Sequence, residues 1–142
     1  MRAAFTLVEI VIVVLILGIL AAVAAPKMFG TSSLAADNSV RQSLGIARAA
    51  IDRFVADNGR YPGSDGNVAT FKTELGIRPF PKLPVGPTAA QNQEVEMDAS
   101  TGSPDGANTP TKGWRYYYKS GMFIVNSNDK LNSDKSIRYD EL

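Results

Sequence analysis

The N-terminal part of the chain contains one long, uninterrupted apolar segment. From Ile10 to Ala25 the sequence has no charge and no strongly hydrogen-bonding side chain. With residues 5–8 added, the segment reaches the roughly 20 residues that a helix needs to cross the hydrocarbon core of a bilayer. Glu9 interrupts it, and a carboxylate at that depth costs about 2.5–3.5 kcal/mol unless a partner neutralises it. Residues 5–25 are therefore predicted to form a transmembrane helix with an unpaired acid near its start.

Beyond this segment the apolar residues recur at steps of three and four, the pattern of an amphipathic helix. Pro26 is the expected site of a kink, because proline removes one backbone hydrogen bond and its ring clashes with the preceding turn. Asp57-Asn58-Gly59 predicts the end of the helix, since asparagine and glycine readily adopt the left-handed conformation. Residues 26–58 are interpreted as an amphipathic continuation of the first helix, with its apolar face formed by Val40, Leu44, Ala47, Ile51, Phe54 and Val55.

Residues 59–142 are predicted to form a head that is rich in loops. From 63 to 112 the chain is dominated by Gly, Pro, Ser, Thr, Asn and Asp, which predicts loops with one helical turn at 71–75. Val95 and Met97 are expected in a short strand.

The clearest strand signal lies at 114–118 and 122–125, two runs joined by a turn that contains a glycine. Such a hairpin is expected to pack on the long helix. The predicted fold class is α+β: a long N-terminal helix, first transmembrane and then amphipathic, packed on a small antiparallel β-sheet head.

The composition excludes several kinds of chemistry. The 142 residues include no cysteine and no histidine, so disulfides, thiolate nucleophiles, histidine bases and the usual transition-metal ligands are all ruled out. Fifteen basic against 14 acidic side chains give a net charge of +1, with no basic stripe of the kind that binds phosphates. Nucleic acid is not an expected partner.

An enzyme built from this sequence would have to use carboxylates alone. Asp57, Glu74, Glu94, Glu96 and Asp98 are the candidates, and no spacing among them marks a catalytic pair. The chain is therefore predicted not to be an enzyme. A carboxylate enzyme on a membrane anchor is the alternative.

The stretch from Ala4 to Ile10, AFTLVEI, resembles the prepilin cleavage and methylation motif of type IV pilins and type II secretion pseudopilins. The resemblance implies that a prepilin peptidase removes the leader, residues 1–4, by cutting between Ala4 and Phe5, and then methylates the new amino terminus of Phe5. Glu9 corresponds to the family's glutamate, and Pro26 to a proline that kinks pilin-like helices. The leader departs from the family pattern, since the family usually has glycine where Ala4 stands.

This resemblance supplies a physical reason for the acid. Once the leader is removed, the carboxylate of Glu9 can pair with the amino terminus of Phe5 in a neighbouring subunit. Breaking such a buried pair typically costs about 3–5 kcal/mol. Glu9 is therefore the expected subunit-assembly residue.

Residues 54–62, FVADNGRYP, also resemble the end of the long helix in the major, G-type pseudopilins. The resemblance implies a structural subunit of a periplasmic pseudopilus that drives type II secretion, a single-pass inner-membrane protein before assembly. Its implied partners are further copies of the chain, minor pseudopilins, the prepilin peptidase, the inner-membrane assembly platform and membrane lipid.

Two alternatives stay open. A pilin of a surface fibre used in adhesion, motility or DNA uptake would carry the same N-terminal motif. A conventionally exported binding domain would instead have its mature N-terminus near Ala25.

G-type pseudopilins commonly hold calcium in a C-terminal loop. Residues 126–134, here named the C-terminal loop, offer oxygens that suit this ion. No ligand is assigned, because the loop does not match the family's calcium pattern residue by residue, and no other cofactor is expected. The candidate oxygens belong to Asn126, Ser127, Asn128, Asp129, Asn132, Ser133 and Asp134.

Overall fold

A computed structural model describes residues 6–76, 80–86 and 90–142. Its main element is helix α1, Leu7–Asn58, whose 52 residues extend for about 78 Å at 1.5 Å per residue. The helix begins at Thr6, whose side chain accepts a hydrogen bond from Glu9 N at 3.2 Å. It ends at Gly59, whose φ of 67° is the left-handed conformation expected of a glycine stop.

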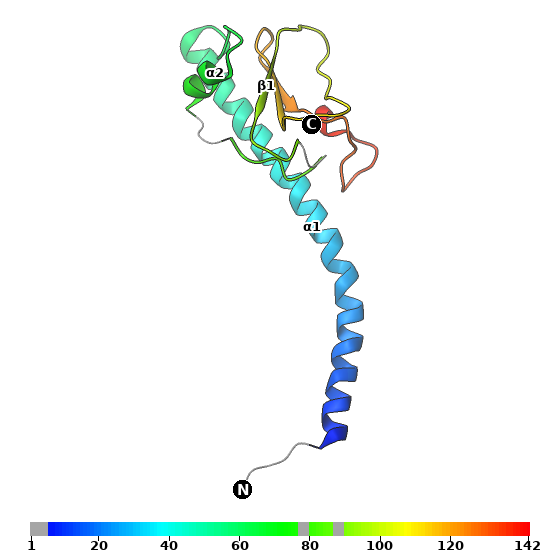
Figure 1. Ribbon diagram of the computed structural model, residues 1–142. Helices are drawn as coiled ribbons and strands as arrows, with labels where there is room; N and C mark the ends of the chain where they lie inside the picture. Colours follow the sequence, from blue (N-terminus) through cyan, green and yellow to red (C-terminus); the bar gives the residue numbers. More distant parts are fainter. Residues whose placement is uncertain (1–5, 77–79, 87–89) are drawn as a thin grey trace.

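The helix is one continuous element, and Figure 1 shows it gently curved, with the head gathered around its C-terminal half. Pro26 lies inside it without ending it. The amphipathic continuation predicted after Pro26 agrees with this course, and a kink at Pro26 stays a prediction.

The head contains a second helix, a short sheet and a final helical turn. Helix α2, Val68–Leu75, includes the turn that was predicted at 71–75. The strands are β1, Val95–Asp98, β2, Trp114–Tyr117, and β3, Met122–Val125, and a 3-10 turn, η2, covers Tyr139–Glu141.

The predicted α+β fold is confirmed, but the sheet is mixed and not wholly antiparallel. Strands β2 and β3 form the predicted antiparallel hairpin, whereas β1 pairs with β2 in parallel, with Val95 opposite Trp114. The reason is the connection at 99–113, which returns the chain to the starting end of β1. A parallel pair needs such a crossover, and here a loop provides it where a helix is usual.

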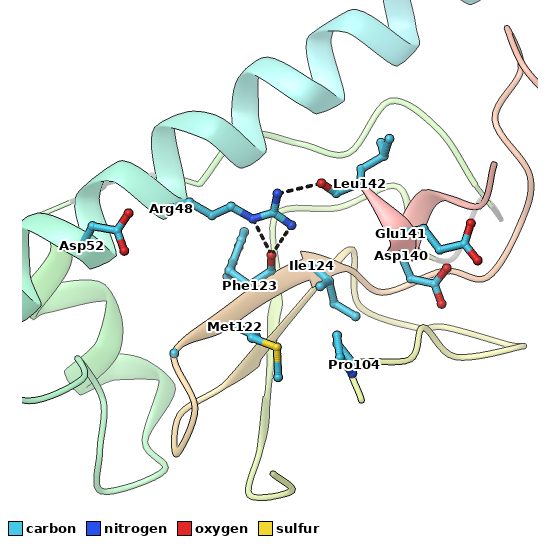
Figure 2. A pocket seen from close by; sticks show the side chains of 10 residues that line it. Arg48, Asp52, Pro104, Met122, Phe123, Ile124, Asp140, Glu141 and Leu142 are labelled. Atoms are coloured by element: carbon cyan, nitrogen blue, oxygen red, sulfur yellow. Dashed lines mark hydrogen bonds between the residues drawn. The ribbon is translucent and has the colours of Figure 1, made fainter. Parts of the chain in front are cut away.

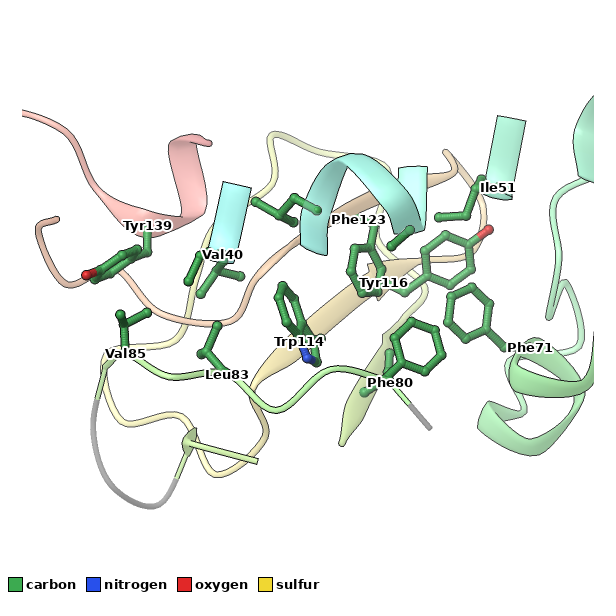
Figure 3. Close-up of a cluster of buried hydrophobic side chains, with 14 of the residues drawn as sticks. Val40, Ile51, Phe71, Phe80, Leu83, Val85, Trp114, Tyr116, Phe123 and Tyr139 are labelled. Atoms are coloured by element: carbon green, nitrogen blue, oxygen red, sulfur yellow. The ribbon is translucent and has the colours of Figure 1, made fainter. Parts of the chain in front are cut away.

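The core lies between the C-terminal half of α1 and one face of the sheet (Figure 3). Trp114 and Tyr116 of β2 lie opposite Val125 and Phe123 of β3, so both strands supply the same core face. Phe71 of α2 stacks on Tyr116 with ring centroids 4.2 Å apart. The aromatic residues of β2 that face this side are therefore part of the hydrophobic core. The helix contributes Val40, Leu44, Ala47 and Ile51, each at most 2% exposed.

Candidate assembly helix and C-terminal loop

The N-terminal half of α1 packs against nothing in the described chain. Its large apolar side chains from Leu7 to Val23 are 49–79% exposed. Among the described residues, one helix, α1, is long and apolar enough to cross a membrane, and its most apolar window is 0% buried. Exposed apolar surface costs about 25 cal/mol per Å² in water. This half of α1 therefore fits a single-pass membrane anchor.

Glu9 lies in the first turn of α1, where a negative charge faces the positive end of the helix dipole. Its backbone N–H is engaged by Thr6, and its carboxylate forms no ion pair within the described part of the chain. Ala4 and Phe5, the predicted cleavage and methylation residues, lie outside the described residues. The structure thus presents an acid at the tip of the anchor, and its pairing with a neighbour stays a prediction.

Arg48 joins α1 to the sheet and to the last residue of the chain (Figure 2). Its Nε and Nη2 donate to the carbonyl oxygen of Phe123 at 3.0 and 2.9 Å, and its Nη1 donates to the oxygen of Leu142 at 2.7 Å. Burial lowers the pKa of this guanidinium. Arg48 lines a pocket of about 590 Å³ together with Asp52 and Glu141. Because its donors are held by backbone oxygens, the arginine positions elements and does not offer a free cation to a ligand.

The acidic residues considered for catalysis lie in three places, which are the end of α1 with Asp57, helix α2 with Glu74, and β1 and its start with Glu94, Glu96 and Asp98. Glu74 pairs with Arg60 at 2.5 Å and accepts from Gly63 N at 2.7 Å, so it holds the segment after α1 in place. Glu96 lies on β1 and pairs with Arg115 at 3.5 Å. These bonds account for the two carboxylates as structural groups.

Asp37 ties α1 to the C-terminal loop. Its carboxylate, on a residue 1% exposed, accepts from Ser133 N and from Tyr139 Oη, each at 2.6 Å. Burial by itself would raise the pKa of Asp37. The hydrogen bonds from Ser133, Tyr139 and the backbone of Asn132 outweigh that effect and hold the pKa below its usual range. The ionised carboxylate is therefore the form that the fold stabilises.

Two of the candidate calcium ligands in the C-terminal loop, Asn126 and Asp134, already accept hydrogen bonds from protein donors. Asn126 is fully buried, its Nδ2 donates to Glu96 Oε2 at 2.8 Å, and its Oδ1 accepts from Ala107 N at 3.2 Å. Asp134 Oδ1 accepts both from the N–H of Ser136 and from its hydroxyl. Calcium requires six to eight converging oxygens. The Oδ1 atoms of Asn126 and Asp134 accept from different neighbours and not from one shared centre, and calcium binding by the loop stays a prediction.

Sequence reasoning missed Asp37 and Arg48. The sequence does contain a signal for both residues, because each lies three or four positions from a residue of the apolar helix face. Asp37 precedes Val40 by three residues, and Arg48 follows Leu44 by four. A charge at a core-facing position of a helix indicates a buried partner. Only the fold identifies the partners, which are far away in the chain.

Comparison with known proteins finds eight curated matches, and those described here are each named type II secretion system core protein G. The protein of Pectobacterium carotovorum is 31% identical over 55% of this chain and 50% of its own length. The protein of Klebsiella pneumoniae is 33% identical over 62% of this chain and 56% of its own length. The protein of Dickeya chrysanthemi is 27% identical over 72% of this chain and 77% of its own length.

The chain spans about half the length of the first curated relatives that it matches. No family model and no solved structure matches it. The names of these relatives describe core proteins of a secretion system and no enzyme, and the absence of enzymatic activity in this chain stays a prediction. The eight matches and the α+β fold with its long N-terminal helix together support the resemblance of this chain to G-type pseudopilins.

Proposed function

We propose that the chain is a structural subunit of a periplasmic pseudopilus that drives type II secretion. The observation that carries the proposal is the division of α1 into a bare apolar half and a half that holds the head. A helix that exposes so much apolar surface needs lipid before assembly and other helices afterwards. Further copies of the chain and minor pseudopilins would supply those helices.

The proposal includes maturation by a prepilin peptidase. Cleavage between Ala4 and Phe5 leaves an α-amino group a few residues before α1, and methylation keeps that group basic. Arg2 in the leader favours a cytoplasmic start, which sends the head to the periplasmic side of the inner membrane. The inner-membrane assembly platform would then take up the mature subunit.

Maturation is tested by intact mass and N-terminal sequencing of the protein recovered from its native membrane. We expect a chain that starts at Phe5 and carries one additional methyl group. A start near Ala25 would show conventional export and would overturn the filament role.

Assembly is tested with Glu9→Gln, which removes the charge but keeps the shape of the side chain. In the proposed filament this change leaves a neighbour's buried amino terminus uncompensated, at a cost of about 3–5 kcal/mol. We expect the variant to insert and to be processed normally, while the yield of sheared filaments falls by about two to four orders of magnitude.

Glu94→Gln is the matched control, since it neutralises an exposed glutamate of the head. It should assemble like the wild type. Normal filament yield from Glu9→Gln would contradict the role given to Glu9.

A further inference from the structure

Arg138 lies between carboxylates that come from distant parts of the head. Its Nη2 donates to Asp105 Oδ1 at 2.6 Å and also to Asp140 Oδ2, and its Nε donates to Asp140 Oδ1 at 2.9 Å. The two acids differ in exposure, with 1% of the Asp140 side chain and 72% of the Asp105 side chain accessible. One guanidinium therefore neutralises a buried acid and ties it to an exposed one.

This arrangement connects the crossover loop, residues 99–113, to the end of the chain. Gly106 N donates to Asp140 Oδ2 at 2.7 Å, so the buried carboxylate receives a backbone N–H as well as the guanidinium. Gly106 also approaches the backbone of Ser127 so closely that a Cβ would lie 2.5 Å from its carbonyl carbon. Three parts of the head therefore meet at this one charged cluster: the crossover loop, the segment that follows β3, and the turn η2.

The electrostatics of Asp140 agree with the geometry. Burial alone would raise the pKa of this carboxyl, whereas the hydrogen bonds from Arg138 and Gly106 N and the charge of Arg138 lower it overall. Bidentate contacts of arginine with a carboxylate are stronger and more directional than neutral hydrogen bonds.

We propose that Arg138 orders the C-terminal part of the head with its own charge, so that the fold of this pseudopilin does not depend on calcium. Both carboxylate oxygens of Asp140 accept hydrogen bonds from Arg138 or Gly106 N, so this buried acid is neutralised by protein groups. A second cation beside it would be repelled. In the same segment, Asp37 of α1 accepts hydrogen bonds from Ser133 N and Tyr139 Oη, so protein groups tie the C-terminal loop to the helix. The inference concerns the fold of the head and does not rest on filament assembly.

The test is thermal unfolding of the full chain in detergent, followed by the fluorescence of Trp114, the single tryptophan, which is buried in the head. We expect the same midpoint in calcium chloride and in EDTA, and no saturable binding of calcium by titration calorimetry. Arg138→Gln should lower the midpoint by several degrees. Lys135→Gln removes one exposed positive charge from the same segment and should leave the midpoint unchanged.

Two results would overturn the proposal: a calcium-dependent rise in the midpoint of the wild type, or an Arg138→Gln variant as stable as Lys135→Gln. If Arg138→Gln does not fold, Arg138→Lys replaces it in the comparison. Lysine keeps the charge but loses the planar fork, so its midpoint should lie below that of the wild type, and a midpoint equal to the wild type would also overturn the proposal.

Discussion

At the scale of single residues, the head is held by charged groups whose partners lie far along the chain. Asp37 bonds to Ser133 and Tyr139, and Arg48 bonds to Phe123. A buried charge without such partners costs several kcal/mol, so each of these residues depends on the segment that it contacts. Losing one partner is therefore more damaging than the modest net value of a hydrogen bond suggests.

Because of Asp37, the stability of the folded head should decrease at acidic pH. Its folded pKa is lower than its ordinary value of 3.8, so the stability that it contributes is fully present above that value. It is lost as the pH falls below 3.8 and through the folded pKa. In Asp37→Asn we expect the free energy of unfolding to fall by about 1–3 kcal/mol at neutral pH.

The measurement is the difference in unfolding free energy between the wild type and Asp37→Asn as a function of pH. That difference should shrink as the pH falls below 3.8, because protonated Asp37 loses its advantage over asparagine. Asp52→Asn, at an exposed position of α1, is the control and should leave the stability at neutral pH unchanged. A difference that stays constant down to low pH would refute the role of the ionised carboxylate.

At the scale of elements, α1 performs two tasks along one continuous helix. Its first half presents apolar side chains on every side, while its second half buries only the face that meets the sheet. Because the helix is continuous, a force or rotation applied at the anchor reaches the head directly. Arg48 strengthens the junction, since it connects α1 with β3 and with Leu142.

Replacing Arg48 with alanine should destabilise the head by about 1–3 kcal/mol, because the carbonyl oxygen of Phe123 loses two charged donors. Denaturant unfolding followed by the fluorescence of Trp114 measures this change. Arg53→Ala is the control on the same helix, since the Arg53 side chain is 86% exposed and lies 4.0 Å from Asp57. It should change the stability by no more than about 0.5 kcal/mol. Equal effects of the two substitutions would disprove the structural role of Arg48.

At the scale of the whole molecule, the head packs on one side of the C-terminal half of α1, and the N-terminal end of the helix lies far from it (Figure 1). Such a shape leaves Glu9 and the apolar surface free of contact with the head. The head keeps its own aromatic core, from Phe71 to Phe123, separate from that surface. Substitutions in the first half of α1 and substitutions in the head therefore affect separate contacts. This separation is the reason for comparing Glu9→Gln with Glu94→Gln.

The sequence by itself determined the apolar segment, the end of the long helix at Gly59, the hairpin and the absence of cysteine and histidine chemistry, whereas the structure showed that the helix runs without a break through Pro26. These features depend on local patterns: a continuous apolar run, a repeat of three and four, and a glycine turn between two strands. The tertiary structure decided the parallel pairing of β1, the partners of Asp37 and Arg48, and the arginine cluster at Asp140. Each of these joins segments that are distant in the chain, and no local pattern specifies which distant groups will meet once the core has packed.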